Sequence, residues 1–211
     1  MLFFGVLWSV YTVIMFFLFC CQSVHYNGGY PSDMAAYIDY IQSVSTGYQF
    51  PYPIMFWLGK VFNLFLSPQY AMAVSVTLLN SIAHIALKYY INQWSMWRNV
   101  VNPPQIICLN VLLFSLLFVS MLFFPVYRQN LYWYRGVNTP NPFHNATYLA
   151  ARGFAVITFA LFMQILIDFD KKADYRKYIY FAISLLVTTM TKPSFTFFLI
   201  CSINTKTYLW E

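Results

Sequence analysis

Charged side chains are scarce in this 211-residue chain: 9% of its residues are Asp, Glu, Lys or Arg, and 60% are hydrophobic. A soluble domain carries about 25% charged residues, so this sequence has too few to coat a surface in water. Residues 1–32 and 99–127 contain no charged side chain, and each stretch exceeds the roughly 20 apolar residues that cross a ~30 Å hydrocarbon core. The scarcity excludes an ordinary soluble domain and predicts an all-α, polytopic membrane protein.

Other sparse features exclude several kinds of site. The spacing of the cysteines is not typical of a disulfide framework or a metal site. They are Cys20, Cys21, Cys108 and Cys201. There is no Gly-rich phosphate loop and no nucleophile elbow. The first apolar run has no basic segment before it and no small-residue cleavage site after it. We therefore expect a retained span there, not a signal peptide, and we predict no metal site.

We expect a single transmembrane domain over residues 1–211, with about five spans near 2–22, 70–92, 104–124, 147–167 and 178–202. The loop between the last two spans holds four basic residues: Lys171, Lys172, Arg176 and Lys177. The positive-inside rule places this loop in the cytoplasm, so the N-terminus is inside and the 23–69 segment is outside. The loop also explains much of the net charge of +6, and nucleic acid is not an expected partner. The expected location is the bacterial inner (plasma) membrane.

The outer 23–69 segment predicts two short juxtamembrane helices. Pro31-Ser32-Asp33 is typical of a helix start, with Ser32 as the N-cap. At helical spacing, Met34, Ile38 and Ile41 form an apolar face. Asp33, Tyr37 and Tyr40 form a polar face of the same helix. Such an amphipathic helix lies on the membrane surface, and we expect it to end at Gly47. A second, more apolar helix is expected over 54–66.

Ionisable residues inside spans point to candidate functional positions, because each costs about 2.5–3.5 kcal/mol at mid-span on insertion scales. Arg152 lies about one turn into the fourth predicted span, and Lys192 lies deep in the fifth. Pro193 follows Lys192 and removes a backbone hydrogen bond, so it kinks or breaks the helix there. Irregular backbone at that depth needs protein or a water-filled cavity around it. His84, inside the second predicted span, is expected to pack or to form a hydrogen bond.

Four separate parts of the sequence supply residues that we expect to converge on one outer cavity: Asp33, His144, Arg152 and Lys192. Arg, Lys and His bind phosphate oxygens, and a carboxylate is a natural general base for a hydroxyl. Each residue keeps an alternative role. Asp33 could complement a helix dipole, Arg152 could reach the headgroups, and His144 could be an ordinary loop histidine. Aromatic residues of the 125–146 loop form either an interfacial belt or a platform for a sugar ring or lipid headgroup.

The order of these features resembles the GT-C superfamily of polytopic glycosyltransferases and bacterial hypothetical membrane proteins of that type. The resemblance is carried by residues 30–37, Tyr-Pro-Ser-Asp-Met-Ala-Ala-Tyr, and by 51–54, Pro-Tyr-Pro-Ile. The 141–145 and 191–194 stretches, Asn-Pro-Phe-His-Asn and Thr-Lys-Pro-Ser, extend it. It implies a polyprenyl-phosphate sugar as donor substrate, an extracytoplasmic acceptor and inversion at the sugar. Asp33 then takes the position of the catalytic base, with Arg152, Lys192, His144 and Tyr37 as substrate-binding residues.

One departure from that superfamily concerns length. Its members usually have more spans and often a soluble C-terminal domain, whereas this sequence stops soon after its fifth predicted span. We therefore expect either the N-terminal module of a longer protein or a compact relative that has lost catalysis. Two other classes stay open: a carrier or lipid-handling subunit that binds an anionic substrate, and a non-catalytic membrane assembly partner. The partners expected in every case are membrane lipids, and the sequence does not fix the oligomeric state.

Overall fold

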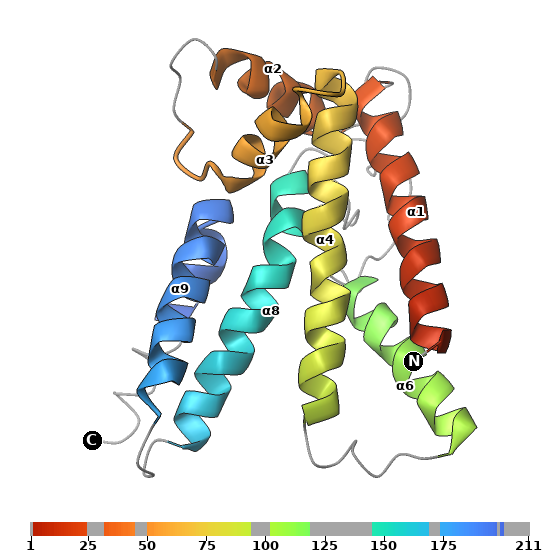
Figure 1. Cartoon of the computed structure of the whole chain (residues 1–211), viewed down its shortest axis with the longest axis vertical. Helices are drawn as coiled ribbons and strands as arrows, with labels where there is room; N and C mark the ends of the chain where they lie inside the picture. The colour runs from red at the N-terminus through yellow and green to blue at the C-terminus, as the bar shows by residue number, and fades with distance from the viewer. Residues whose placement is uncertain are drawn as a thin grey trace, which may run out of the picture.

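The computed structural model describes residues 2–24, 32–44, 50–93, 102–118, 145–168, 174–197 and 199–200. Within these ranges every regular element is a helix (Figure 1). The helices are α1 (Leu2–Val24), α2 (Met34–Val44), α3 (Ile54–Phe62), α4 (Pro68–Gln93), α6 (Pro103–Phe118), α8 (Ala146–Ile167) and α9 (Tyr175–Thr191). The described part of the chain confirms the all-α class.

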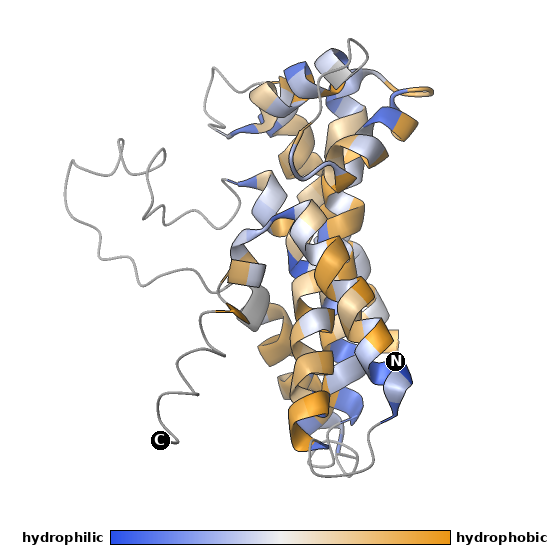
Figure 2. Cartoon of the chain, turned by 90° about the vertical axis from the view of Figure 1, so that its left-hand side faces the viewer, coloured by the Kyte–Doolittle hydropathy of each residue, from blue (hydrophilic) through white to orange (hydrophobic). Residues whose placement is uncertain are grey.

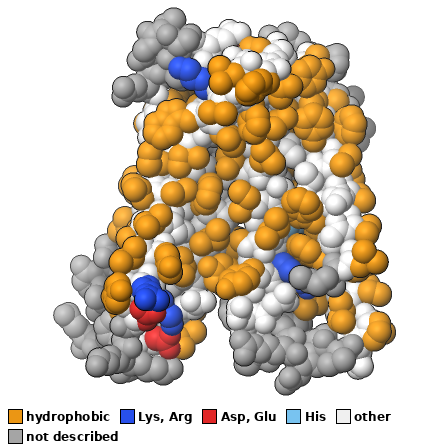
Figure 3. Space-filling view, viewed as in Figure 1, with side chains coloured by type: hydrophobic (Ala, Val, Ile, Leu, Met, Phe, Trp, Pro, Cys, Tyr) orange, Lys and Arg blue, Asp and Glu red, His pale blue; other side chains and the backbone are white. Residues whose placement is uncertain are grey.

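Three helices in the described ranges, α1, α4 and α8, are long and apolar enough to cross a membrane. A shorter apolar stretch, Pro103–Ser115, lies in α6. Large apolar side chains on these helices point outward, such as Val10 at 51% and Phe17 at 63% exposed. Figure 2 shows apolar residues along the length of the bundle, and Figure 3 shows them covering one face of the molecule. Apolar exposure on this scale favours a surface that faces lipid.

Helix α4 lies at the centre of the bundle and contacts α1, α3 and α8 (Figure 1). Its contact with α8 depends on Gly153, because an added Cβ there would lie 2.9 Å from Ile82 Cγ2 and 3.1 Å from the Ala83 backbone nitrogen. Both distances are shorter than ordinary van der Waals contact. Small residues at an interface let two membrane helices approach closely. Gly153 therefore sets the separation of α4 and α8.

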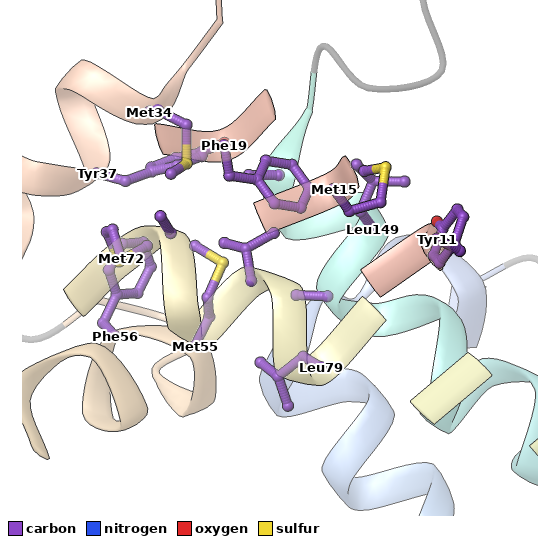
Figure 4. Close-up of a cluster of buried hydrophobic side chains, with 14 of the residues drawn as sticks. Tyr11, Met15, Phe19, Met34, Tyr37, Met55, Phe56, Met72, Leu79 and Leu149 are labelled. Atoms are coloured by element: carbon purple, nitrogen blue, oxygen red, sulfur yellow. The ribbon is translucent and has the colours of Figure 1, made fainter. Parts of the chain in front are cut away.

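Helices α2 and α3 cover one end of the bundle, which we call the α2–α3 end (Figure 1). Their apolar side chains form a core with α1 and α4 that is almost completely buried. Figure 4 shows this core, which includes Phe19, Met34, Met55, Phe56 and Met72. This burial explains why the short α2 and α3 are fixed on the bundle, since an isolated helix shorter than about 12 residues is only marginally stable.

The start of α2 agrees with the sequence, and one of its faces does not. Ser32 Oγ accepts a hydrogen bond from Met34 N at 3.1 Å, as an N-cap does. Met34 and the rest of the apolar face are buried as predicted. The spacing predicts that Tyr37 lies on the polar face, but Tyr37 is buried, with its ring centre 5.7 Å from that of Phe56. The reason is that α3 packs on this side of α2 as well.

Helix α9 ends at Thr191, and Lys192 has extended backbone (φ −164°, ψ 120°) before helical structure resumes at residue 194. The predicted break at Pro193 is confirmed. The ring of a proline clashes with the preceding residue in the α-conformation, so Lys192 leaves the helix. The backbone nitrogen of Lys192 still donates to Thr188 O at 2.8 Å.

Hydroxyl groups join α8 to α9 inside the bundle. Thr158 Oγ1 lies 2.6 Å from Ser184 Oγ and 2.9 Å from Thr188 Oγ1. Thr158 and Thr188 are completely buried, and Ser184 is 9% exposed. The Thr158 hydroxyl thus hydrogen-bonds to each of the other two in the buried interface. The three hydroxyls fix the pairing of α8 with α9.

Charged residues gather at the end of α8 and the start of α9, opposite the α2–α3 end (lower left of Figure 3). Lys177 Nζ lies 2.6 Å from Asp168 Oδ2, and the Asp174 side chain accepts from Arg176 N at the start of α9. Asp168 therefore balances the charge of a basic residue of α9. Lys171 and Lys172 lie outside the described residues.

Candidate functional site

The break in α9 turns Lys192 toward the start of α8. Lys192 Nζ donates a hydrogen bond to Thr147 Oγ1 at 3.1 Å, although the two residues are 45 positions apart in the sequence. The extended backbone of Lys192, which Pro193 favours, directs the ammonium to the first turn of α8.

Thr147 is held in place by the residue that caps α8. Asn145 Oδ1 accepts from Tyr148 N at 3.1 Å and from the Thr147 hydroxyl at 2.6 Å. Thr147 is 1% exposed. Because its proton goes to Asn145, the Thr147 oxygen has lone pairs available to Lys192. The Asn145-Ala146-Thr147 triplet, which matches a glycosylation sequon, thus caps a helix and positions Lys192.

Asp33 and Tyr37 bring α2 to the same place. Tyr37 OH donates to Asp33 Oδ2 at 3.3 Å, and the Thr147 side chain lies beside the Tyr37 hydroxyl. Burial raises the pKa of the Tyr37 hydroxyl, and the nearby Asp33 charge raises it further, against the opposing effect of the Thr147 side chain. The hydroxyl therefore stays protonated and keeps its role as a donor to Asp33.

The Asp33 carboxylate also interacts electrostatically with the Lys192 ammonium. We name Asp33, Tyr37, Thr147 and Lys192 the Asp33–Lys192 cluster. It joins the first turn of α2, the first turn of α8 and the residue after α9. The Asp33 carboxylate, which accepts hydrogen bonds, and the Lys192 ammonium, which donates them, then lie near a helix N-terminus, where negative charge is favoured. This arrangement can bind a phosphate oxygen and accept a proton from a hydroxyl group.

Arg152 lies about one turn further along α8 and is buried, with 9% of its surface exposed. Its guanidinium lies 5.0 Å from the centre of the Tyr148 ring. It also interacts electrostatically with Tyr11 of α1 and His84 of α4. Arg152 therefore interacts with side chains in the interior of the bundle.

Sequence reasoning placed four residues in one cavity, and the structure brings two of them, Asp33 and Lys192, into one cluster. His144 and the aromatic residues of the 125–144 loop lie outside the described residues. Sequence reasoning missed Thr147 as a member of the cluster. The sequence contains part of the information needed: Asn145 is a favoured N-cap residue directly before an apolar helix, which places Thr147 in the first turn of that helix. The described residues contain no group of three His, Cys, Asp or Glu side chains that could hold a metal ion.

The fold and composition define a helical integral membrane protein with three candidate spans in the described residues. The chain is similar to NADH-ubiquinone oxidoreductase chain 4 of Wickerhamomyces canadensis, with 35% identity over 68 residues. That similarity covers 32% of this chain and 12% of the length of that protein. No protein-family model matches the chain, and no solved structure matches it.

Proposed function

We propose that the chain is a GT-C-like membrane glycosyltransferase module that uses a polyprenyl-phosphate sugar as donor. In this proposal α6 and α9 cross the membrane with α1, α4 and α8, which gives five spans. The α2–α3 end faces the extracytoplasmic side, and α2 and α3 are the two juxtamembrane helices. The basic residues between α8 and α9 lie in the cytoplasm, as the positive-inside rule requires, and so does the N-terminus.

The Asp33–Lys192 cluster is the observation that carries the proposal. A carboxylate on a juxtamembrane helix and an ammonium at a helix break interact at the same end of the bundle. Ionisable groups at membrane depth are costly unless a function or a partner retains them. The pair supplies the two groups that sugar transfer from a lipid phosphate requires: a base for the acceptor and a cation for the leaving phosphate.

The chemistry of the proposed step is an inverting displacement. Asp33 accepts the proton of the acceptor hydroxyl while the oxygen of that hydroxyl attacks the anomeric carbon of the donor. The bond between that carbon and the phosphate oxygen breaks, and the lipid phosphate leaves with the electron pair. Lys192 stabilises the charge that develops on the phosphate. Tyr37 positions Asp33 through its hydrogen bond to Oδ2, and in this proposal Oδ1 takes the proton of the acceptor.

Transfer by an Asp33→Asn variant is the direct test. The assay uses purified protein in liposomes, a panel of synthetic polyprenyl-phosphate hexoses and detection of released polyprenyl phosphate. Asparagine keeps the shape of the side chain but cannot accept the proton, so we expect at least a ~100-fold loss of rate, in the range of general-base catalysis. Asp39→Asn is the matched control, because Asp39 lies on the same helix and is exposed. Equal rates for wild type and the Asp33 variant would remove Asp33 from the mechanism.

A carrier or lipid-handling subunit is the second candidate, and the position of Arg152 favours it. Lys192 reaches Thr147 in the first turn of α8, and buried Arg152 lies five residues further along that helix, as successive binding positions for an anionic substrate would. A carrier alternates its access, so a cysteine placed beside Lys192 would react with impermeant thiol reagents from both sides of the membrane. A transferase predicts labelling from the extracytoplasmic side alone. Labelling from both sides would favour the carrier.

A further inference from the structure

A second polar group lies where α1, α4 and α6 meet, away from the Asp33–Lys192 cluster. His84 of α4 is completely buried, and neither Nδ1 nor Nε2 has a hydrogen-bond partner among the described residues. Asn80, one turn earlier on α4, is 1% exposed, and its Oδ1 is likewise unpartnered there. Residues four positions apart share one face of a helix. Two neighbouring side chains thus present polar atoms to the same apolar interior.

Side chains from the adjacent helices complete the surroundings of His84. Tyr11 of α1 accepts a hydrogen bond from Asn80 Nδ2 at 2.6 Å, and its ring centre lies 4.1 Å from that of His84. Phe114 of α6 stacks on the imidazole at 4.5 Å between ring centres, and its own ring centre lies 6.0 Å from that of Tyr11. Asn110, one turn from Phe114, is 1% exposed and has an unpartnered Oδ1 among the described residues. A buried polar atom without a partner is rare in native proteins and calls for a physical cause.

We propose that His84 and Asn80 form a binding site for water inside the helix bundle, which Phe114 closes. A water molecule bridges an imidazole nitrogen of His84 to Asn80 Oδ1. Buried water makes about three hydrogen bonds to such groups, and His84 and Asn80 supply two of them.

The charges and atom types select a small neutral ligand. The amide oxygens and the basic imidazole nitrogen are acceptors, so they disfavour an anion. Arg152 interacts electrostatically with His84, so its positive charge disfavours a cation. The remaining class is a neutral hydrogen-bond donor. Because the polar atoms are buried under aromatic rings, that donor has to be as small as water.

Phe114 controls entry, because its ring covers the imidazole face. Helix α6 contacts α4 along this junction and exposes its opposite face, including Leu112. The bound water therefore exchanges with bulk water only when the Phe114 ring turns away from His84. This site does not depend on the function proposed above.

Solid-state NMR of ¹⁵N-histidine-labelled protein in bilayers tests the proposal. The chain has three histidines, and His84→Phe identifies the His84 signals by their loss. Magnetisation that starts on water is transferred only to groups that water contacts. We expect transfer to the His84 imidazole nitrogens in the wild type, with ¹⁵N shifts of a hydrogen-bonded ring. Absence of transfer together with shifts of a ring that forms no hydrogen bond would overturn the proposal.

Two variants of α6 test the role of Phe114. Phe114→Ala removes the cover, so transfer from water to His84 should become at least twofold faster than in the wild type. Leu112→Ala is the control on the same helix, because Leu112 is 47% exposed and points away from the junction. Equal transfer rates in wild type and Phe114→Ala would refute closure by Phe114. The wild-type spectrum decides the water site itself, whether or not the Phe114 variant folds.

Discussion

Replacement of Gly153 by alanine tests the close approach of α4 and α8 that supports the candidate site. The new Cβ would lie 2.9 Å from Ile82 Cγ2 and 3.1 Å from the Ala83 backbone nitrogen. Ile82 is β-branched and has little rotamer freedom in a helix, and the Ala83 contact is with backbone. Neither neighbour can move without a shift of the whole helix. We therefore expect α8 to move away from α4.

The magnitude follows from two opposing effects. Alanine is favoured over glycine inside a helix by about 1 kcal/mol. Overpacking of a close contact costs about 1–3 kcal/mol, and a contact with backbone belongs at the upper end of that range. We expect a net loss of about 1–2 kcal/mol in the free energy of unfolding. A chain of this size loses about 2–4 °C in Tm per kcal/mol, so Tm should fall by about 2–8 °C.

The assay is thermal unfolding of purified protein in detergent, followed by circular dichroism. Gly5→Ala is the matched control, because nothing lies within 4 Å of a Cβ added at Gly5 in α1. That control should be as stable as the wild type or more stable. If Gly153→Ala and Gly5→Ala have the same Tm, α4 and α8 are not packed as closely as described.

Two further changes address the pairing of α8 with α9. Thr158→Val leaves the buried Ser184 and Thr188 hydroxyls with one partner fewer, so the free energy of unfolding should fall by about 1 kcal/mol. Thr189→Val is the control, because it keeps the hydroxyls of Thr158, Ser184 and Thr188. An equal fall in the free energy of unfolding for both variants would contradict the assignment. Pro193→Ala allows α9 to continue through Lys192, which withdraws the ammonium from Thr147. Binding of polyprenyl phosphate, measured by native mass spectrometry, should weaken while Tm stays within a few degrees, and unchanged affinity would mean that the break does not position Lys192.

Local chemistry in the sequence was sufficient for the helices and for two of their ends. Uninterrupted apolar runs predict helices, because backbone groups in lipid can only be satisfied within the segment. Ser32 as an N-cap and Pro193 as a helix breaker act on neighbouring residues alone. These features therefore needed no knowledge of the tertiary structure.

Contacts between distant helices were not predictable from periodicity. Tyr37 follows the polar spacing of α2, yet α3 covers it, and the sequence does not indicate on which side a neighbouring helix will pack. Thr147 joins the cluster only because α9 ends level with the start of α8. The partners of Arg152 depend on the rotation of α8 about its axis, which Gly153 and the hydroxyls around Thr158 determine.

The affinity of the chain for polyprenyl phosphate tests the phosphate-binding role of Lys192 most directly. Native mass spectrometry would compare the wild type, Lys192→Met and Lys88→Met, the control being a lysine whose ammonium lies 5.7 Å from the centre of the Phe4 ring. A hydrogen bond to a charged group contributes about 1.5–3 kcal/mol, and every 1.4 kcal/mol is tenfold in affinity. The account predicts that Lys192→Met binds at least about tenfold more weakly and that Lys88→Met binds as the wild type does. Equal affinity of all three proteins would contradict it.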